Sequence, residues 1–277
     1  MQKPIKKEID LGGKKLTLET GELALQANGS VLAKYGDTVV LATAVSQSAS
    51  ADIGYFPLSV EYEEKLYAGG KISTSRFIKR ETRPTEEAVL TGRLIDRSIR
   101  PLFPKDYQAE VQVIITVLSV DAVNDPDVVS LIAASAALSI SDIPWNGPLS
   151  GLRVSKLNGQ LVINATEEEK ALASLNSIIA TSKNGDISMI ETEGKEVSEN
   201  DIVEAMDIAS TEGKKVIKLI EDLAEEVGVL KQEYIPQKAD EKTVTKVQKF
   251  IKDILIKDLT SVQKSCPTFL KKKLQII

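Results

Sequence analysis

The sequence predicts an α+β protein in which helices pack on mixed sheets. Two observations lead to this fold class. First, β-rich apolar runs precede helical patterns in two successive blocks, at residues 10–142 and 150–228. Second, apolar residues make up 42% of the 277 positions, which is enough to bury a core in a chain of this length. A basic amphipathic stretch after residue 237 predicts a further, separate helix.

The first block begins with strand patterns. Residues 14–19 and 56–61 alternate apolar and polar side chains, as strands with one buried face do. Residues 38–45 form a β-rich apolar run directly after a Tyr-Gly-Asp turn at 35–37. Residues 110–120 are mostly β-branched and apolar, which predicts a buried strand.

Two helices are predicted in the same block. The first runs from about residue 84 to 99, with glutamates near its positive end, arginines near its negative end, and prolines directly after it. The second opens at the sequence Asn124-Asp125-Pro126 and continues to about residue 139. Its run from 131 to 138 is apolar on nearly all sides, so we expect it to be a central helix.

The second block repeats this order on a smaller scale. Residues 152–157 and 160–163 flank Asn-Gly at 158–159, which is a strong signal for a two-residue hairpin turn. Residues 174–181 and 187–192 predict two more strands around a second Asn-Gly pair. We therefore expect four strands here.

Capping signals then define the helices of the second block. Thr166 with Glu169 has the form of a capping box, and so has Ser198 with Asp201. The second of these opens a long helix that ends near residue 227 because Gly228 follows it. After it, residues 237–265 predict the basic amphipathic helix.

The composition excludes several kinds of chemistry. The chain contains no His, so neither a Ser-His-Asp nor a Cys-His catalytic arrangement can form. Its single cysteine, Cys266, can supply neither a thiolate zinc site nor an intrachain disulfide, and it is better explained as incidental than as a nucleophile. Chemistry is left to carboxylates, Lys, Arg, Tyr, backbone amides or an oxygen-bound metal such as Mg²⁺.

Charge is distributed unevenly along the chain. The net charge is −5, yet residues 65–105 carry +6 while residues 106–239 carry −13. This pattern argues against an indiscriminate nucleic-acid binder and leaves one basic block that can hold phosphate groups. No apolar run reaches the ~18 residues of a membrane span, and no apolar segment follows the basic start. We therefore expect no signal peptide, no membrane association and a cytoplasmic location.

The basic block contains the most informative group of residues. Arg93, Arg97 and Arg100 are spaced so that they share one stripe of the predicted helix. The segment before it carries one aromatic residue among several cations. Such a group suits single-stranded RNA, because cations bind its phosphates while a ring stacks on a base. The candidate RNA-binding residues are Phe77, Lys79, Arg80, Arg83, Arg93, Arg97 and Arg100.

A structural alternative stays open for these residues. The arginines could form salt bridges with acidic residues such as Glu61, Glu63 and Glu64, and Phe77 could belong to the core. Because Phe77 lies among four basic residues, it is a poor core candidate, and this favours the functional interpretation.

Other candidate sites are weaker. The Gly-Gly-Lys sequence at 69–71 lacks the spacing of a phosphate-binding loop. The pairs Asp125/Asp127 and Glu191/Glu193 could hold Mg²⁺, but solvated turn charges or helix caps explain them better. We therefore predict no catalytic residue and no metal ligand in this chain.

The run FIKRETRPTEEAVLTGRLIDRSIRPLFP at residues 77–104 resembles the signature of the first ribonuclease PH-like core domain of bacterial polynucleotide phosphorylase. Flanking motifs occur in the same order as in that family, and the resemblance extends from about residue 5 to 230. These motifs are YGDT at 35–38, FPL at 56–58, EVQV at 110–113, AASAAL at 133–138 and NGP at 146–148.

The resemblance implies a domain organisation and an activity. It implies a ribonuclease PH-like core in two blocks, 1–145 and 146–232, followed by the start of an all-helical linker domain at 237–277. It implies 3′-to-5′ phosphorolytic degradation of RNA to nucleoside diphosphates in mRNA turnover, with inorganic phosphate as co-substrate and Mg²⁺ as cofactor. The implied partners are single-stranded RNA, two further copies in a ring-shaped homotrimer, and RNA-degradation complex proteins.

The resemblance also implies roles for the basic block. The basic aromatic loop of the family corresponds to Phe77, Lys79 and Arg80, with Arg83 beyond it, and its RNA-facing helix carries the three arginines of the stripe. Three positions depart from the family pattern. Lys79 stands where Arg is usual, which keeps the charge but loses the bidentate fork. Ile78 stands where a second aromatic is usual and Thr82 where Gly is usual, so the loop loses one stacking surface and has less freedom for a positive φ.

A larger departure concerns catalysis. In the family, the phosphate and metal sites lie in a second ribonuclease PH-like core after the helical linker, and the resemblance places residue 277 before that core. The chain is therefore expected to supply RNA-channel contacts and ring interfaces and to be inactive alone. The alternative is a non-catalytic fragment for RNA binding or assembly.

Overall fold

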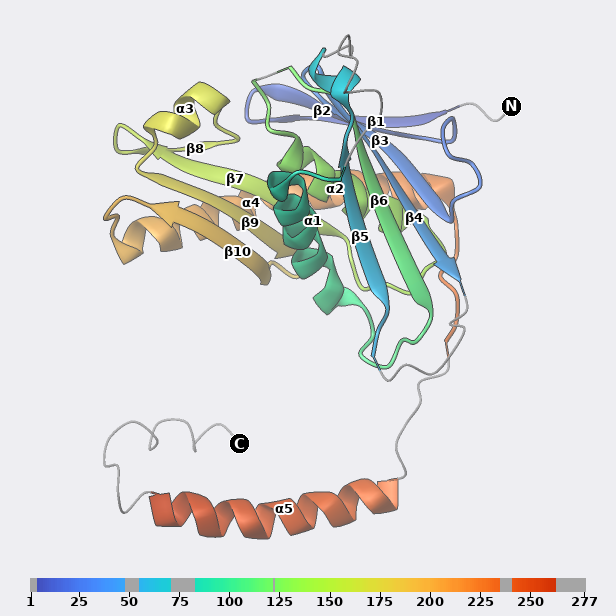
Figure 1. Ribbon diagram of the computed structural model, residues 1–277, viewed down its shortest axis with the longest axis vertical. Coiled ribbons are helices and arrows are strands. Elements are labelled where there is room, and N and C mark those ends of the chain that lie inside the picture. Colours follow the sequence, from blue (N-terminus) through green and yellow to red (C-terminus); the bar gives the residue numbers. More distant parts are fainter. Residues whose placement is uncertain (1–3, 48–54, 71–82, 122, 235–240, 263–277) are drawn as a thin grey trace. The chain divides into compact units, whose positions relative to one another are not determined.

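A computed structural model of the chain describes residues 4–47, 55–70, 83–121, 123–234 and 241–262, without the side chains of 241 and 253–262. It divides into two units, Met1–Tyr234 and Ile235–Ile277, and each is described by itself. In the first unit, two sheets and their helices form successive layers (Figure 1).

The larger sheet of the first unit has six strands in the order β1-β2-β3-β4-β6-β5. All neighbours are antiparallel except β5 and β6, which run parallel. In β4, Val40, Ala42 and Ala44 are fully buried while Leu41 and Thr43 between them are half-buried, so one face of this sheet meets the core. The strands are β1 Ile5–Leu11, β2 Lys14–Thr20, β3 Gly29–Tyr35, β4 Thr38–Gln47, β5 Leu58–Glu64 and β6 Glu110–Ser119.

The smaller sheet has four antiparallel strands in the order β10-β9-β7-β8. Asn158 and Gly159 form the turn between β7 and β8, with φ values of 49° and 84° that suit a two-residue hairpin. The strands are β7 Leu149–Leu157, β8 Gln160–Ile163, β9 Leu175–Ser182 and β10 Ile187–Gly194.

Helix α2 (Pro126–Ile140) lies between the two sheets and contacts β3, β4 and β7. It approaches both sheets closely because glycines face it. A Cβ on Gly29 would lie 2.2 Å from the Ala137 carbonyl oxygen, and one on Gly151 would lie 2.4 Å from Leu131. Nearly every residue of α2 is buried, so it forms the centre of the core, as its sequence predicts.

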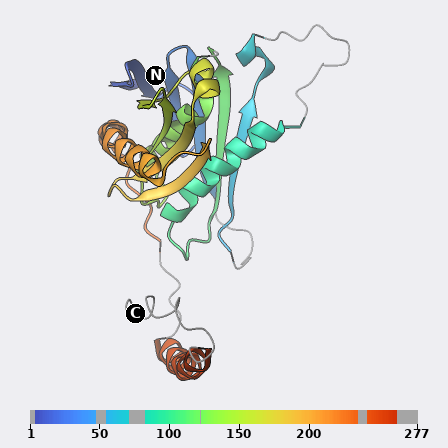
Figure 2. The same cartoon turned by 90° about the vertical axis from the view of Figure 1, so that its left-hand side faces the viewer.

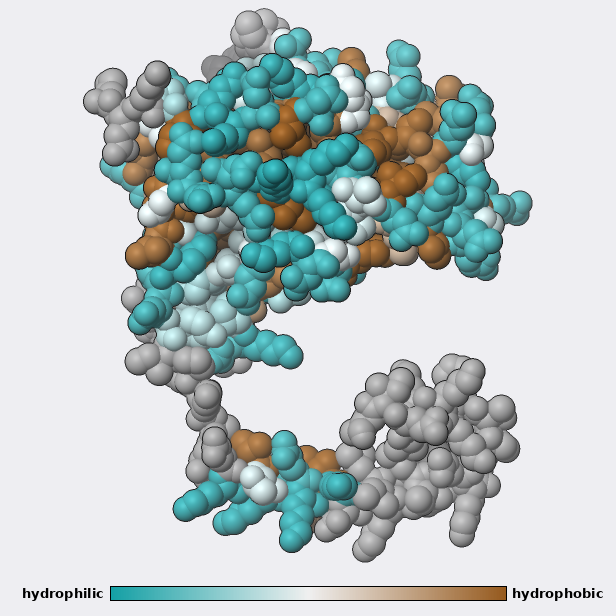
Figure 3. Space-filling view, turned by 180° about the vertical axis from the view of Figure 1, so that it is seen from behind, coloured by the Kyte–Doolittle hydropathy of each residue, from teal (hydrophilic) through white to brown (hydrophobic). Residues whose placement is uncertain are grey.

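Two more long helices complete the first unit. Helix α1 (Glu86–Ile99) packs against β5 and β10, and α4 (Glu199–Val227) packs against β7 and β9 (Figures 1 and 2). The shorter helices are η1 Leu66–Gly69, η2 Arg100–Leu102 and α3 Glu167–Leu172. Seen from the side opposite to Figure 1, hydrophilic side chains cover most of this unit, with apolar patches between them (Figure 3).

The predicted α+β class is confirmed, and most predicted elements are present with small shifts of their ends. Both capping boxes form, with Thr166 and Ser198 accepting hydrogen bonds from the amides of Glu169 and Asp201. Helix α4 ends at Gly228, whose φ of 69° is left-handed, as the sequence predicts. Strands β1 and β3 were not predicted from the sequence patterns.

The second unit contributes helix α5 (Glu241–Val262), within the predicted range 237–265. Val244, Val247, Phe250 and Ile251 are exposed on it. Apolar side chains gather along one side of this helix in Figure 3. Among the residues that the structure describes, no helix is both long and apolar enough to cross a membrane.

Candidate nucleic-acid interface

Helix α1 carries the predicted arginines, and its start is capped. The hydroxyl of Thr85 accepts a hydrogen bond from the amide of Ala88 at 3.0 Å and donates to Glu64 of β5 at 3.2 Å. Glu86 and Glu87 follow in the first turn, where negative charge stabilises a helix. These contacts fix where α1 begins beside β5.

The other end of α1 is held by Trp145 and by a residue of the second block. The last carbonyl groups of a helix have no partner within it, so they need other donors. The Ser98 carbonyl accepts a hydrogen bond from the hydroxyl of Ser188 in β10 at 2.8 Å, and the Ile99 carbonyl accepts one from the indole of Trp145 at 3.1 Å. Helix α1 is thus fixed at both ends.

Arg93 and Arg97 lie one turn apart on the exposed side of α1. Neither guanidinium group forms an ion pair or a hydrogen bond within the described part of the chain. Leu90, which is 59% exposed, lies on the same stripe, and Arg83 is exposed just before the helix. Two unpaired cations on a fixed helix can therefore meet an extended polyanion.

Arg100 differs from the other two arginines because its guanidinium group is bound inside the unit. Its Nε and Nη2 donate to the two carboxylate oxygens of Asp96 at 3.0 and 2.6 Å. Its Nη1 and Nη2 also donate to the carbonyl oxygens of Phe56 and Leu58, at 3.4 and 3.1 Å. The stripe predicted from spacing exists, but within the described part of the chain Arg100 has partners while Arg93 and Arg97 lie exposed without them.

The alternative salt bridges with the acidic end of β5 do not form with the α1 arginines in the described residues. Each of these carboxylates has another contact: Gln112 for Glu61, Lys65 for Glu63 and Thr85 for Glu64. The loop residues Phe77, Lys79 and Arg80 lie outside the described residues, so their roles stay predictions.

Asp125 and Asp127 lie at the start of α2, where the sequence predicts solvated turn charges or helix caps. Asp125 does cap the helix, by accepting a hydrogen bond from the Asp127 amide at 3.2 Å. Both carboxylates also accept hydrogen bonds from the guanidinium group of Arg153 in β7, and Asp125 accepts one from Lys170 in α3. The Arg153 side chain is only 7% exposed. The predicted helix cap is thus confirmed for Asp125, whereas the ion pairs with Arg153 and Lys170 were not predicted.

These contacts also decide whether the pair fits Mg²⁺. A magnesium site needs carboxylate oxygens that are free to coordinate the ion. Here the oxygens of Asp125 and Asp127 are bound to two cationic side chains, so this donor set does not fit a metal. Glu191 and Glu193 are exposed in β10, and no group of three or more potential ligands occurs in the described residues.

Burial changes the titration of this cluster. Desolvation raises the pKa of Asp127 to about 7, and the neighbouring Asp125 carboxylate acts in the same direction. The pKa of Asp125 is instead lowered, because Arg153 and Lys170 outweigh its burial. The two carboxyl groups thus titrate apart.

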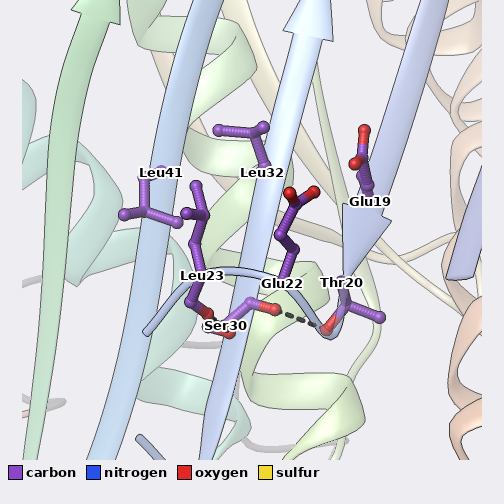
Figure 4. A pocket seen from close by; sticks show the side chains of 7 residues that line it. All are labelled: Glu19, Thr20, Glu22, Leu23, Ser30, Leu32 and Leu41. Atoms are coloured by element: carbon purple, nitrogen blue, oxygen red, sulfur yellow. Dashed lines mark hydrogen bonds between the residues drawn. The ribbon is translucent and has the colours of Figure 1, made fainter. Parts of the chain in front are cut away.

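The six-stranded sheet carries a shallow hollow on the face away from α2 (Figure 4). Its polar groups are used internally, since the Thr20 hydroxyl donates to the Ser30 carbonyl and the Ser30 hydroxyl donates to the Leu23 carbonyl, both at 2.7 Å. Of its two carboxylates, Glu19 accepts a hydrogen bond from Lys34 at 3.3 Å. The lining residues are Glu19, Thr20, Glu22, Leu23, Ser30, Leu32 and Leu41.

Comparison with family models now gives the class of protein. Residues 12–144 match the model described as 3′ exoribonuclease family, domain 1, and residues 147–212 match domain 2 of the same family. The two matches together cover well over half of the chain, which therefore belongs to the 3′ exoribonuclease family.

The curated relatives are polyribonucleotide nucleotidyltransferases. One from Alkaliphilus oremlandii is 46% identical over 95% of this chain and 37% of the relative. One from Staphylococcus epidermidis is 44% identical over 91% of this chain and 36% of the relative. The predicted resemblance to bacterial polynucleotide phosphorylase is confirmed, and the chain spans about a third of the length of these relatives.

Solved structures confirm the ribonuclease PH-like fold. A chain of the Archaeoglobus fulgidus exosome with RNA bound to the active site gives a TM-score of 0.58 at 18% identity, covering 78% of this chain and 87% of that chain. Rice Rrp46 gives a TM-score of 0.59 at 13% identity, covering 81% of this chain and 95% of that chain. At these identities the likeness concerns the fold alone.

One important residue, Arg153, was missed by reasoning from the sequence. It is a single cation inside the buried run of β7, and a charge in such a run is a signal for a buried partner. Asp96 is different: three neighbouring arginines repel one another unless carboxylates compensate them, and the sequence indicates Asp96 as one such carboxylate. The structure confirms this for Arg100, four residues further along the helix.

Proposed function

We propose that this chain supplies RNA-binding contacts in a phosphorolytic 3′-to-5′ exoribonuclease of the polynucleotide phosphorylase type. The observation that carries the proposal is the pair Arg93 and Arg97, which are exposed on a helix fixed at both ends and have no partner among the residues that the structure describes. They belong to the basic block at residues 65–105, which carries +6 in a chain whose net charge is −5. Phosphate groups of single-stranded RNA are the matching ligand.

The proposed reaction is attack of inorganic phosphate on the terminal phosphodiester of RNA, which releases a nucleoside diphosphate. The α2 carboxylates are bound to Arg153 and Lys170, so the proposal gives them no part in this step. It assigns phosphate attack and the Mg²⁺ requirement to another core of a homotrimeric, cytoplasmic enzyme, which can join other RNA-degrading proteins. The role of the described surface is to hold the strand.

A charge-matched pair of variants tests RNA binding. We expect R93Q/R97Q to weaken the affinity of the full chain for a single-stranded RNA 20-mer by about tenfold, because two phosphate contacts are lost. The control K214Q/K218Q also removes two exposed cations one turn apart, but from α4, and should leave affinity nearly unchanged. Fluorescence anisotropy measures both. Equal losses in the two variants would contradict the proposal.

A second experiment separates RNA phosphorolysis from a purely non-catalytic RNA-binding or assembly role. The purified chain is incubated with poly(A), phosphate and Mg²⁺, and ADP is measured. We expect RNA binding without ADP from this chain alone. Sustained ADP release that depends on phosphate would contradict the assignment of catalysis to another core, while loss of all RNA binding would leave assembly as the better function.

A further inference from the structure

The guanidinium group of Arg100 has little capacity left for a ligand. A guanidinium group has five N–H donors. Four of them are used by Asp96, Phe56 and Leu58, as described above. The side chain is 41% exposed, so exposure alone would suggest an RNA ligand, but its hydrogen bonds show that the charge is already satisfied.

The contacts of Arg100 join two elements rather than one. Asp96 belongs to α1, whereas the Leu58 carbonyl group is at the first residue of β5 and the Phe56 carbonyl group lies two residues before it. The guanidinium carbon also lies 5.9 Å from the centre of the Phe56 ring, which in turn packs 4.7 Å from Phe103. Arg100 therefore links the last turn of α1 to the start of β5 above an aromatic cluster.

We propose that Arg100 is a positioning residue, which holds α1 against β5 so that Arg93 and Arg97 face the RNA strand. The inference rests on the proposed RNA-binding function of α1. Arg97 lies three residues and Arg93 seven residues before Arg100, so a shift of the last helical turn displaces both guanidinium groups. Arg100 itself does not bind a phosphate.

Two variants that keep the net charge test this role. R100K retains the cation but loses the planar fork that reaches two carboxylate oxygens and two carbonyl groups. D96N/R100Q removes the ion pair as a whole. For both, we expect RNA affinity to fall roughly fivefold at a temperature where all proteins are folded, with the slope of log affinity against log salt unchanged. R93Q, measured beside them, should reduce that slope by about 0.7 because one phosphate contact is lost.

Two results would overturn the inference. If Arg100 binds phosphate directly, R100K keeps wild-type affinity and D96N/R100Q loses about 0.7 of the slope. If Arg100 is only structural, both variants melt at a lower temperature while the affinity of the folded protein is unchanged.

Hydrogen exchange separates failure of this inference from failure of the proposed function. If R93Q changes neither affinity nor slope, the proposed function is wrong. Amide exchange in the last turn of α1 still tests whether Arg100 holds α1 against β5. Faster exchange in D96N/R100Q supports this role, and unchanged exchange overturns it.

Discussion

Arg153 joins the two blocks of the core through its hydrogen bonds. From β7 it donates to Asp125 and Asp127 at the start of α2, and to Asn176 in β9 at 3.0 Å. A buried ion pair is costly to break, because the remaining charge is left without compensation. The cluster therefore makes the relative position of α2 and the four-stranded sheet depend on a few specific contacts.

The raised pKa of Asp127 predicts how stability changes with pH. In the unfolded chain this carboxyl group ionises near pH 3.9, whereas in the folded protein its pKa is about 7. The folded state thus binds the proton more tightly, and its contribution to stability is present below pH 4 and lost as pH rises towards 7. Asp127→Asn removes this loss. The free energy of unfolding of D127N, relative to that of wild type, should therefore increase as the pH rises from about 4 to about 7.

Urea unfolding at pH 4.5, 6 and 8 measures this difference. Asp207→Asn is the control, since Asp207 is exposed on α4 and its replacement should follow wild type at every pH. A difference between D127N and wild type that stays constant with pH would show that Asp127 is ionised throughout.

At single positions, local sequence patterns indicate which residues share one side of a helix, but they do not show contacts with residues far away in the chain. The spacing of Arg93 and Arg97 correctly indicates a common stripe, because a helix fixes which residues share a side. The hydrogen bonds of the Asp125 and Asp127 carboxylates depend on Arg153, which is 26 residues away from Asp127 in the chain. No local pattern contains that contact, so the sequence predicts a helix cap or solvated charges but not the buried ion pairs.

At the scale of elements, helix α4 packs closely on the four-stranded sheet at Gly213. A Cβ on Gly213 would lie 2.3 Å from the Ser150 hydroxyl oxygen and 2.7 Å from that of Thr181. These two hydroxyl groups are buried and bonded to each other at 2.7 Å. An added methyl group must therefore separate the helix from the sheet or break a buried hydrogen bond.

Two glycine substitutions in helices test this close packing. We expect Gly213→Ala to lower the free energy of unfolding by about 1–3 kcal/mol, because the methyl group overpacks the contact. In Gly92→Ala of α1, the new Cβ would lie 3.5 Å from its nearest neighbour, the Val60 carbonyl oxygen, which is an ordinary contact. That variant should be unchanged or more stable by up to ~1 kcal/mol, because alanine favours a helix. Equal effects in urea unfolding would contradict this account of α4.

The elements that could be predicted are those with strong periodicity or explicit caps. Helix α2 is apolar on all sides, and α4 has a capping box and a terminal glycine, so local physics defines both. Strand β1 is an edge strand whose charged and half-buried residues alternate, and β3 is a short run with two small residues at its start. Their strand character depends on pairing with β2 and β4, which a single segment does not show.

At the scale of the whole molecule, the distribution of charge over the core unit predicts which region binds RNA. The basic block at 65–105 includes α1, while the rest of the core unit is acidic, so an RNA strand is attracted to one region and repelled from others. The chain spans about a third of the length of its relatives, which is why its binding role and the activity of the complete enzyme are separate proposals.

The most direct measurement of the central claim is a map of where RNA touches the chain. Single-stranded RNA containing 4-thiouridine is cross-linked to the full protein by light, and the modified peptides are identified by mass spectrometry. We predict cross-links within residues 77–100, which include α1, and their reduction in R93Q/R97Q. Cross-links confined to α4 or α5, or unchanged by that double substitution, would contradict the account.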